Sequence, residues 1–320
     1  MNPILEVDDL RTAFATEAGE LRAVDGVSFA LEPGKLMGLV GESGSGKTVT
    51  ALSIMRLLPD SARTIGGAIR FDGVNLLELD ERHMRKIRGA QIAMVFQEPM
   101  TSLNPVFTIG NQVGEAIRLH QHTDRAETLR RSVDALQMVG IADAPRRVND
   151  YPHQLSGGMR QRVMIAMALA CRPRVLIADE PTTALDVTIQ AQILDLIRDL
   201  QRQLGLAVLL VTHDLGIVAE YADDVTILYA ARVMERTSSA ELFRNPLSPY
   251  TRGLLQSIPG VGGHRQDRLN AIPGTIPSLL NPPSGCRFNP RCSMAIPDCA
   301  RVVPPLEVKA PGHEVACIRV

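Results

Sequence analysis

The segment GESGSGKT, at residues 41–48, decides the fold of this chain. It satisfies the phosphate-loop pattern G-x-x-x-x-G-K-[ST] and carries one further glycine inside the loop. Glycines let backbone N–H groups converge on phosphate oxygens, and a helix that begins at Lys47 adds its partial positive charge. A Gly/Ser-rich loop without a ligand is the alternative. We expect ATP to be bound by Gly41, Ser43, Gly44, Ser45, Gly46, Lys47 and Thr48, with the Thr48 hydroxyl also on Mg²⁺.

The sequence on both sides of the loop predicts an α/β fold. An apolar run at 35–41 indicates a buried strand, and 47–58 indicates the helix that follows it. Further apolar runs alternate with segments of helical period, which is the pattern of a mostly parallel sheet. The later strands are expected at 91–96, 175–179, 207–212 and 225–230, and the helices between them at 188–203 and 215–221.

Two stretches depart from this alternation. From about 108 to 170 the pattern becomes mostly helical, which predicts a helical subdomain at about 105–170 inserted into the α/β core. After about residue 246 Pro, Gly and Cys become frequent and periodicity fades. We therefore place a nucleotide-binding domain at residues 1–250 and a loop-rich, cysteine-rich appendage at residues 251–320.

Composition narrows the class of protein. With 320 residues, of which 45% are hydrophobic and 22% charged, the chain resembles an ordinary globular protein. A net charge of −1 gives no basic footprint for nucleic acid. No run approaches the ~20 apolar residues that a membrane-spanning helix needs, and the N-terminal MNPILEVDDL carries acids where a signal peptide carries positive charge. We expect a cytosolic chain that reaches a membrane only through a partner.

Polar residues at the ends of three predicted strands suggest a hydrolytic site. Asp179 can hold Mg²⁺, and Glu180 can orient and deprotonate the attacking water; a pair of surface carboxylates is the alternative. Gln97, after the strand at 91–96, can contact the metal and the water. His213 can touch the γ-phosphate, because ligands gather at the carboxyl ends of parallel strands. Taken alone, Gln97 and His213 are more simply a loop residue and a structural histidine.

The segment LSGGM, at residues 155–159, opens a predicted helix. Ser-Gly-Gly at a helix start is an anion site, although a capping serine followed by flexible glycines is the alternative. One chain cannot easily fold this cap over its own phosphate loop. We therefore expect two such domains to close head-to-tail on shared nucleotide, so that ATP binding and hydrolysis drive a motion.

Taken together, these segments resemble the ATP-binding-cassette (ABC) ATPase family over residues 1 to about 245. The resemblance implies a P-loop fold with a mostly parallel core sheet, an antiparallel β subdomain and an inserted helical subdomain. The shared motifs, in chain order, are the phosphate loop, Gln97, LSGGM, the pair Asp179 and Glu180, the segment Ala184, Leu185 and Asp186, and His213.

The likeness extends over essentially the whole chain to the branch that serves dipeptide and oligopeptide importers, and its dipeptide members in particular. It rests on FQEPMTSLNP at 96–105, YPHQLSGGM at 151–159, DEPTTALDVTIQAQIL at 179–194 and NPRC at 289–292. Met159 stands where most of the superfamily has Gln, and LSGGM followed by RQR is typical of this branch. Ala231 stands where Gly is commoner; we expect it in a turn away from the nucleotide motifs, with a strained backbone as the consequence.

The resemblance also implies roles for single residues. Ser156, Gly157 and Gly158 of one subunit are expected to bind the γ-phosphate held by the phosphate loop of the other, and Asp186 to organise the dimer seam. Adenine needs a stacking aromatic, for which Phe14 is the candidate, with a core or loop position as the alternative. Residues 100–105 are expected to face the cytoplasmic loops of a membrane subunit, or to be an ordinary loop.

By the same resemblance, ATP hydrolysis energises import of dipeptides or oligopeptides. The implied partners are a second ABC ATPase subunit, preferably a paralogue, two transmembrane permease subunits and, indirectly, an extracytoplasmic peptide-binding protein, with no nucleic acid. The chain is then peripheral at the cytoplasmic face of the inner (plasma) membrane. Alternatives are another small solute such as nickel or an opine, a soluble cassette ATPase acting on DNA or ribosomes, and a non-hydrolysing subunit. The single cassette without a basic arm and the intact Lys47 and Glu180 disfavour the last two.

Four of the five cysteines lie in the last 35 residues, with the spacing C-x5-C-x6-C-x17-C. This matches neither the usual zinc pattern nor a ferredoxin run. A small Pro-rich segment in the cytosol nevertheless suggests a metal centre, because disulfides are disfavoured there and the core is small. The importer branch resembles this chain here and can carry a [4Fe–4S] cluster; Zn²⁺ and free thiols stay open. The ligands are expected to be Cys286, Cys292, Cys299 and Cys317, whereas Cys171 is expected to be a buried thiol.

Overall fold

A computed structural model describes residues 2–97, 102–183, 185–257 and 272–320. The chain divides into two compact units. The first unit comprises residues 1–31, 35–77 and 210–320, and the second comprises 32–34 and 78–209. Residues 98–101, which belong to FQEPMTSLNP, and Ala184, which belongs to DEPTTALDVTIQAQIL, lie outside the described residues.

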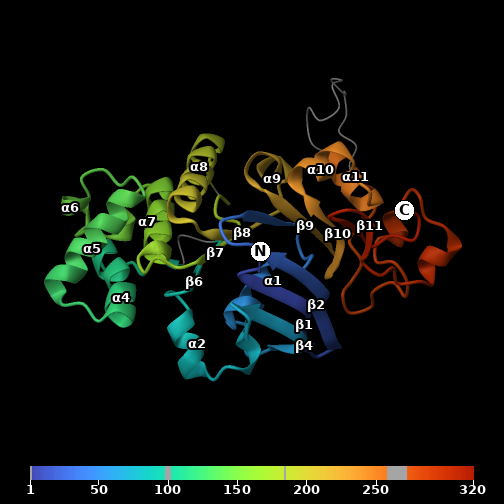
Figure 1. Cartoon of the computed structure of the whole chain (residues 1–320), viewed down its shortest axis with the longest axis horizontal. Helices are drawn as coiled ribbons and strands as arrows, with labels where there is room; N and C mark the ends of the chain where they lie inside the picture. The colour runs from blue at the N-terminus through green and yellow to red at the C-terminus, as the bar shows by residue number, and fades with distance from the viewer. Residues whose placement is uncertain (1, 98–101, 184, 258–271) are drawn as a thin grey trace. The chain divides into compact units, whose positions relative to one another are not determined.

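The first unit contains an antiparallel sheet near the N-terminus, in which neighbouring strands lie side by side in Figure 1. Apolar periodicity gave no strands here, although the family resemblance implied such a subdomain. The reason is a break of register between Val7 and Leu10, where Asp9 takes a positive φ of 46° and interrupts the alternation of buried and exposed residues. In spatial order the strands are β2 (Gly19–Leu31), β1 (Leu5–Thr16), β4 (Ala62–Phe71) and β5 (Val74–Asn75).

A second set of strands in the first unit ends at the phosphate loop. The strand β3 (Leu36–Val40) is buried at every residue, which explains its unbroken apolar run, and it pairs in parallel with β9 (Asp224–Tyr229). The C-terminal residues join the same set, because β12 pairs with β10. The remaining strands are β10 (Arg232–Ser238), β11 (Glu307–Ala310) and β12 (His313–Val315).

The helices of the first unit pack around these strands. Helix α1 (Lys47–Met55) ends three residues before the expected position, because Arg56 takes the left-handed conformation with φ 51°. Helix α11 (Pro249–Gln256) crosses the boundary expected at residue 250, and the division into domains stays a prediction. The others are α9 (Leu215–Tyr221), α10 (Ser239–Arg244), η3 (Asn289–Arg291) and η4 (Pro297–Ala300), while η1 (Leu76–Glu78) lies where the chain passes between units.

The second unit joins two parallel strands to a group of helices, as the helical pattern predicted (Figure 1). Side-chain caps begin its longer helices at Thr108, Asp124, Ser156 and Asp186. Its strands are β6 (Ile92–Val95) and β7 (Val175–Asp179). Its helices are α2 (Glu81–Ile87), α4 (Ile109–Gln121), α5 (Arg125–Met138), α6 (Ala144–Arg147), η2 (Pro152–Gln154), α7 (Gly157–Leu169) and α8 (Val187–Leu204).

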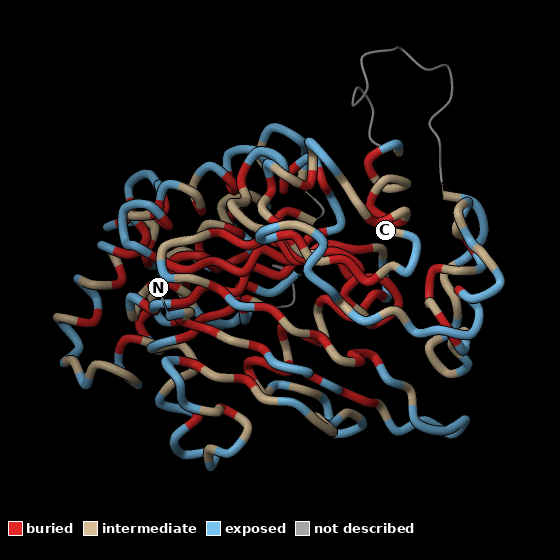
Figure 2. The backbone as a smooth tube through the Cα atoms, turned by 45° about the vertical axis from the view of Figure 1, so that its right-hand side comes forward, coloured by how far each residue is buried: buried red, intermediate tan, exposed pale blue. Residues whose placement is uncertain are grey.

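Strand β8 (Ala207–Thr212) contains the point at which the chain passes back to the first unit. Burial follows the strands: the buried residues, red in Figure 2, concentrate on them and on the inner faces of the helices. Within the described ranges, no helix has the length and apolar character needed to cross a bilayer.

Candidate active site

Main-chain atoms of two strands, β9 and β2, lie close to the glycines of the phosphate loop. A Cβ atom at Gly41 would lie 2.2 Å from the carbonyl oxygen of Leu228, at the end of β9. Gly46 has a φ of +101°, and a Cβ there would lie 2.3 Å from the carbonyl oxygen of Ala23 in β2. Neither contact can be relieved by a side-chain rotation, so both positions require glycine.

Two side chains of the loop are buried although they are polar. Lys47 is 5% exposed, and its Nζ donates to the carbonyl oxygens of Gly41 at 2.8 Å and Glu42 at 3.1 Å, which keeps the positive charge at the loop. Ser45 is 1% exposed, and its hydroxyl makes no hydrogen bond to the described residues. A buried hydroxyl without a partner costs about 1–3 kcal/mol, so a ligand oxygen is the partner that this position suits. Thr48, in the first turn of α1, is half-buried.

Ala231 lies against the phosphate loop, so the expected position away from the nucleotide motifs is wrong. Its N–H donates to the carbonyl oxygen of Ser45 at 3.1 Å, and its own carbonyl accepts from the N–H of Asp25 at 2.9 Å. The reason is the parallel pairing of β3 with β9, which brings the turn after β9 to the edge where β3 ends. The predicted strain is confirmed, because Ala231 has a φ of 72°.

The second unit carries the predicted carboxylates at the end of β7. Asp179 is 2% exposed as the last residue of the strand. Glu180 follows with a φ of 44°, a left-handed conformation that is costly for a residue other than glycine. Its Oε2 accepts from Gln97 Nε2 at 2.9 Å and from Thr183 Oγ1 at 3.1 Å. The structure therefore brings Gln97 to Glu180. It also adds Thr183, which the sequence did not single out because a pair of adjacent threonines is common.

The LSGGM segment lies at the start of α7, with Gly157 exposed and Gly158 half-buried. The Ser156 hydroxyl accepts from the N–H of Met159 at 3.4 Å, as a capping serine does, and Ser156 and Gly157 are exposed. At Gly158 a Cβ would lie 2.8 Å from Ile189 Cγ2, so a larger residue would displace that side chain. The helix start thus presents N–H groups on an accessible surface.

The structure also places the three remaining candidates, Asp186, His213 and Phe14. The Asp186 carboxylate accepts from the N–H of Ile189 at 3.0 Å and caps α8. His213 follows β8 and is exposed. Phe14 is half-buried in β1, opposite Leu21 of β2. Their parts in nucleotide binding stay predictions.

Comparison with known proteins decides the family. The sequence profile described as "ABC transporter" matches residues 24–183, and the profile described as "Oligopeptide/dipeptide transporter, C-terminal region" matches residues 234–299. A probable peptide ABC transporter ATP-binding protein of Sinorhizobium fredii is 55% identical, over 99% of this chain and 95% of that protein. This chain belongs to the ABC transporter ATPase family. As an ABC ATPase it binds and hydrolyses ATP, and the expected fold and family are confirmed.

Two further relatives bear on this ABC ATPase. The oligopeptide transport ATP-binding protein AppD of Bacillus subtilis is 49% identical, over 99% of this chain and 97% of that protein. Among solved structures, an ATP-binding cassette in a dimeric post-hydrolysis state, bound to ADP and Pi, superposes with a TM-score of 0.66. It is 27% identical and covers 73% of this chain and 98% of its own.

The four C-terminal cysteines of this ABC ATPase line one small cavity in the first unit. The cavity has a volume of about 20 Å³, and its apolar lining includes Phe288, Met234 and Ala316. All four are free thiols, and no group of three or more His, Cys, Asp or Glu in the described part of the chain is arranged to hold a single metal ion. Burial, and to a lesser degree the neighbouring thiols, raise the pKa of Cys286 and Cys292. The cysteines of this cavity are Cys286, Cys292, Cys299 and Cys317.

Cys171 is half-buried, whereas a buried thiol was expected. Its Sγ donates to the carbonyl oxygen of Ala116 at 3.4 Å, and burial raises the pKa of the thiol. The side chain belongs to the packing of the helical group in the second unit.

Proposed function

We propose that this ABC ATPase energises the import of dipeptides or oligopeptides across a membrane. The observation that carries the proposal is the extent of the similarity: relatives named as peptide-import ATP-binding proteins match 99% of the chain at 55% identity. The oligopeptide/dipeptide C-terminal profile supports the same cargo. In proteoliposomes that hold the assembled importer, short peptides presented with the binding protein should stimulate ATP hydrolysis. Stimulation by nickel or an opine, with none by peptides, would reassign the cargo.

We assign the steps of ATP hydrolysis to the following residues. Lys47 and the glycines hold the phosphates, and the Glu180 carboxylate, oriented by Gln97 and Thr183, takes a proton from the attacking water. The oxygen atoms of Thr48, Gln97 and Asp179 suit Mg²⁺, which neutralises charge on the phosphates when bound. His213 is assigned to the γ-phosphate and Phe14 to the adenine.

Two ABC ATPase subunits close head-to-tail on ATP in this proposal. Each subunit places Ser156, Gly157 and Gly158 on the γ-phosphate held by the other, and Asp186 lines the seam. The exposure of Ser156 and Gly157 at a helix start supports this role, and so does the dimeric state of the similar solved cassette.

The dimer is tested by filling the space above the LSGGM segment. The double variant Ser156→Phe with Gly157→Val should bind ATP normally and lose most of its hydrolysis, because the partner can no longer dock. The control Ala126→Val changes an exposed residue in the first turn of α5, in the same unit. Normal turnover by the double variant would reject the sandwich.

The cysteine segment is proposed to hold a [4Fe–4S] cluster, with Zn²⁺ as the second candidate. The proposal rests on the four thiols that line one cavity and on their chemistry, since thiolate ligands suit both metals. When bound, such a group would cross-link four points of a segment that has little core of its own. After anaerobic purification we expect a brown protein with iron and sulfide in equal amounts. Equimolar zinc without iron would reject the cluster, and the absence of both metals would indicate free thiols.

The partners are proposed to be a second, paralogous ABC ATPase, two transmembrane permease subunits and, indirectly, an extracytoplasmic peptide-binding protein. The chain is then peripheral at the cytoplasmic face of the inner membrane, with a nucleotide-binding domain at 1–250 and a C-terminal extension at 251–320. A pull-down from a detergent extract should recover two membrane subunits and a second cassette. Recovery of ribosomal or DNA-bound proteins instead would favour a cassette ATPase of the non-transport class.

A further inference from the structure

The segment that carries the cysteines contacts the phosphate loop through buried arginines. Arg291 stands next to Cys292, and Arg287 stands next to Cys286. Their side chains are 5% and 8% exposed, and each pairs with a carboxylate near the loop. All of these residues belong to the first unit.

The Arg291 guanidinium binds Glu42, the second residue of the phosphate loop, with both arms. The two bonds, from Nη1 to Oε2 and from Nη2 to Oε1, are 2.8 Å and 3.1 Å long. Nε donates to the carbonyl oxygen of Pro273 at 3.0 Å, and the guanidinium carbon lies 5.7 Å from the centre of the Tyr229 ring. The fork is therefore fixed on several sides, and a lysine could not reproduce it.

The backbone of Glu42 makes several of the hydrogen bonds that fix the shape of the loop. Its carbonyl oxygen accepts from Lys47 Nζ and from the N–H of Ser45, each at 3.1 Å. Its N–H donates to the hydroxyl of Tyr250 at 3.3 Å. A displacement of the Glu42 side chain would therefore shift the carbonyl that holds the phosphate-binding lysine.

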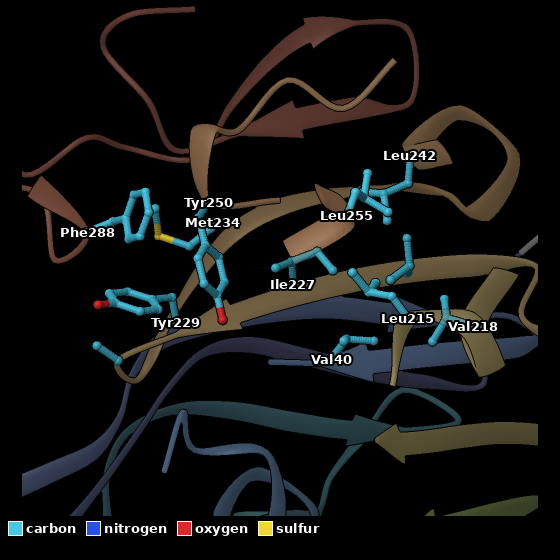
Figure 3. Close-up of a cluster of buried hydrophobic side chains, with 12 residues drawn as sticks. Val40, Leu215, Val218, Ile227, Tyr229, Met234, Leu242, Tyr250, Leu255 and Phe288 are labelled. Carbon is cyan, nitrogen blue, oxygen red and sulfur yellow. The ribbon is translucent and has the colours of Figure 1, made fainter. Parts of the chain in front are cut away.

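An aromatic cluster of Tyr229, Tyr250 and Phe288 supports this contact. The rings lie together at one end of the apolar cluster in Figure 3, with centres 4.6 Å to 5.3 Å apart. Phe288 lies between the two arginines in sequence, and Cys286 and Cys292 pack against the same cluster. The cysteine segment thus shares one core with Val40, the residue that precedes the loop.

Arg287 reaches the other end of the loop by a longer route. It donates to Asp25 at 2.7 Å, and Asp25 also binds Arg232. The N–H of Asp25 bonds the carbonyl of Ala231, whose N–H bonds the carbonyl of Ser45.

We propose that Arg291 is a positioning residue for nucleotide binding: through Glu42 it holds the phosphate loop in its binding shape, and it makes ATP affinity depend on the cysteine segment. Arg287 supports the same loop from its far end. The arginine does not touch nucleotide in this proposal, so its effect is on affinity for ATP and on the geometry of Lys47.

The test measures the dissociation constant for ATP and the turnover number separately. Arg291→Gln should weaken ATP binding by about fivefold or more, the lower end of ordinary coupling between sites, and Arg291→Lys should fall between it and the wild type. Turnover at saturating ATP should change by less than about twofold. The matched control is Arg236→Lys, because Arg236 pairs with Glu314 and so ties β12 to β10 within the same unit, and its bonds to the described residues do not include Glu42.

A second variant covers the case in which Arg291→Gln does not fold. Glu42→Gln keeps the size of the side chain and leaves the bond from Arg291 to Pro273, and it should weaken ATP binding similarly. In the double variant the two losses should not add, because both remove one interaction. Unchanged ATP affinity in Arg291→Lys and Glu42→Gln, or an equal loss in Arg236→Lys, would overturn the proposal.

Discussion

Replacement of Glu180 by Gln separates a catalytic role from a structural one. The carboxylate oxygen Oε2 accepts two hydrogen bonds, from Gln97 and from Thr183. The amide oxygen of a glutamine can accept the same two, so the local arrangement should survive. What is lost is the ability to take a proton from water, together with the negative charge.

The two losses differ enough in size to be told apart. A positioned general base contributes 10²–10⁴ in rate, which is about 2.7–5.5 kcal/mol of barrier. Two charge-assisted hydrogen bonds at a half-buried position become neutral ones, which costs about 1–2 kcal/mol of stability. We therefore expect hydrolysis to fall at least a hundredfold while ATP affinity stays near that of the wild type. A closed, ATP-loaded dimer should accumulate.

The assay combines phosphate release at saturating ATP, a fluorescent-nucleotide titration and sedimentation with ATP. Thr183→Val is the control, because it removes one bond to the same oxygen and keeps the carboxylate, and it should lose less than about tenfold in rate. If Glu180→Gln hydrolyses ATP within tenfold of the wild type, or if Thr183→Val is equally slow, Glu180 is not the base.

Three further predictions concern the first unit. Lys47→Ala should weaken ATP binding itself, since a buried ammonium beside the loop is removed; unaltered affinity in a nucleotide titration would contradict the phosphate-loop assignment. Ala231→Gly should raise the melting temperature. It removes a left-handed conformation that costs about 1–2 kcal/mol, whereas the added entropy of the unfolded chain costs only about 0.5–1 kcal/mol. A lower melting temperature in calorimetry would refute the strain. Burial raises the pKa of Asp25, but the hydrogen bond from Arg232 and the charges of Arg232, Arg287 and Arg22 outweigh it and hold the pKa below 3.8. This stabilisation is fully present above the ordinary pKa of an aspartate and is lost as the pH falls through the lower, folded pKa. The melting temperatures of wild type and Asp25→Asn should therefore differ most near neutral pH, and the difference should shrink as the pH falls below about 4; a constant difference would contradict the ion pairs.

Local patterns allowed much of the core to be predicted. Fully buried strands such as β3 and β7 appear in the sequence as short apolar runs, and side-chain caps such as Ser156 and Asp186 mark where helices begin. The phosphate loop is a local motif as well, because its strand, glycines and helix are consecutive. These elements needed no knowledge of what packs against them.

The contacts that could not be predicted join residues far apart in sequence. Ala231 meets Ser45 only because β9 pairs in parallel with β3, and that pairing leaves no mark on either strand. Arg291 is 249 residues from Glu42, and an arginine in NPRC resembles any surface arginine until its partner is known. The bulge at Asp9 hid a strand for a different reason, since it breaks the alternation on which recognition depends.

The tight seating of Gly41 and Gly46 against Leu228 and Ala23 has a thermodynamic consequence. Gly41 and Gly46 cannot move without disturbing strands β9 and β2, so the amides of these two residues should exchange with solvent only when the whole unit opens. The entropy lost in ordering the phosphate loop is then part of the free energy of folding and not of nucleotide binding. Nucleotide then binds to a preformed site, and more of its binding free energy remains to bring the two subunits together.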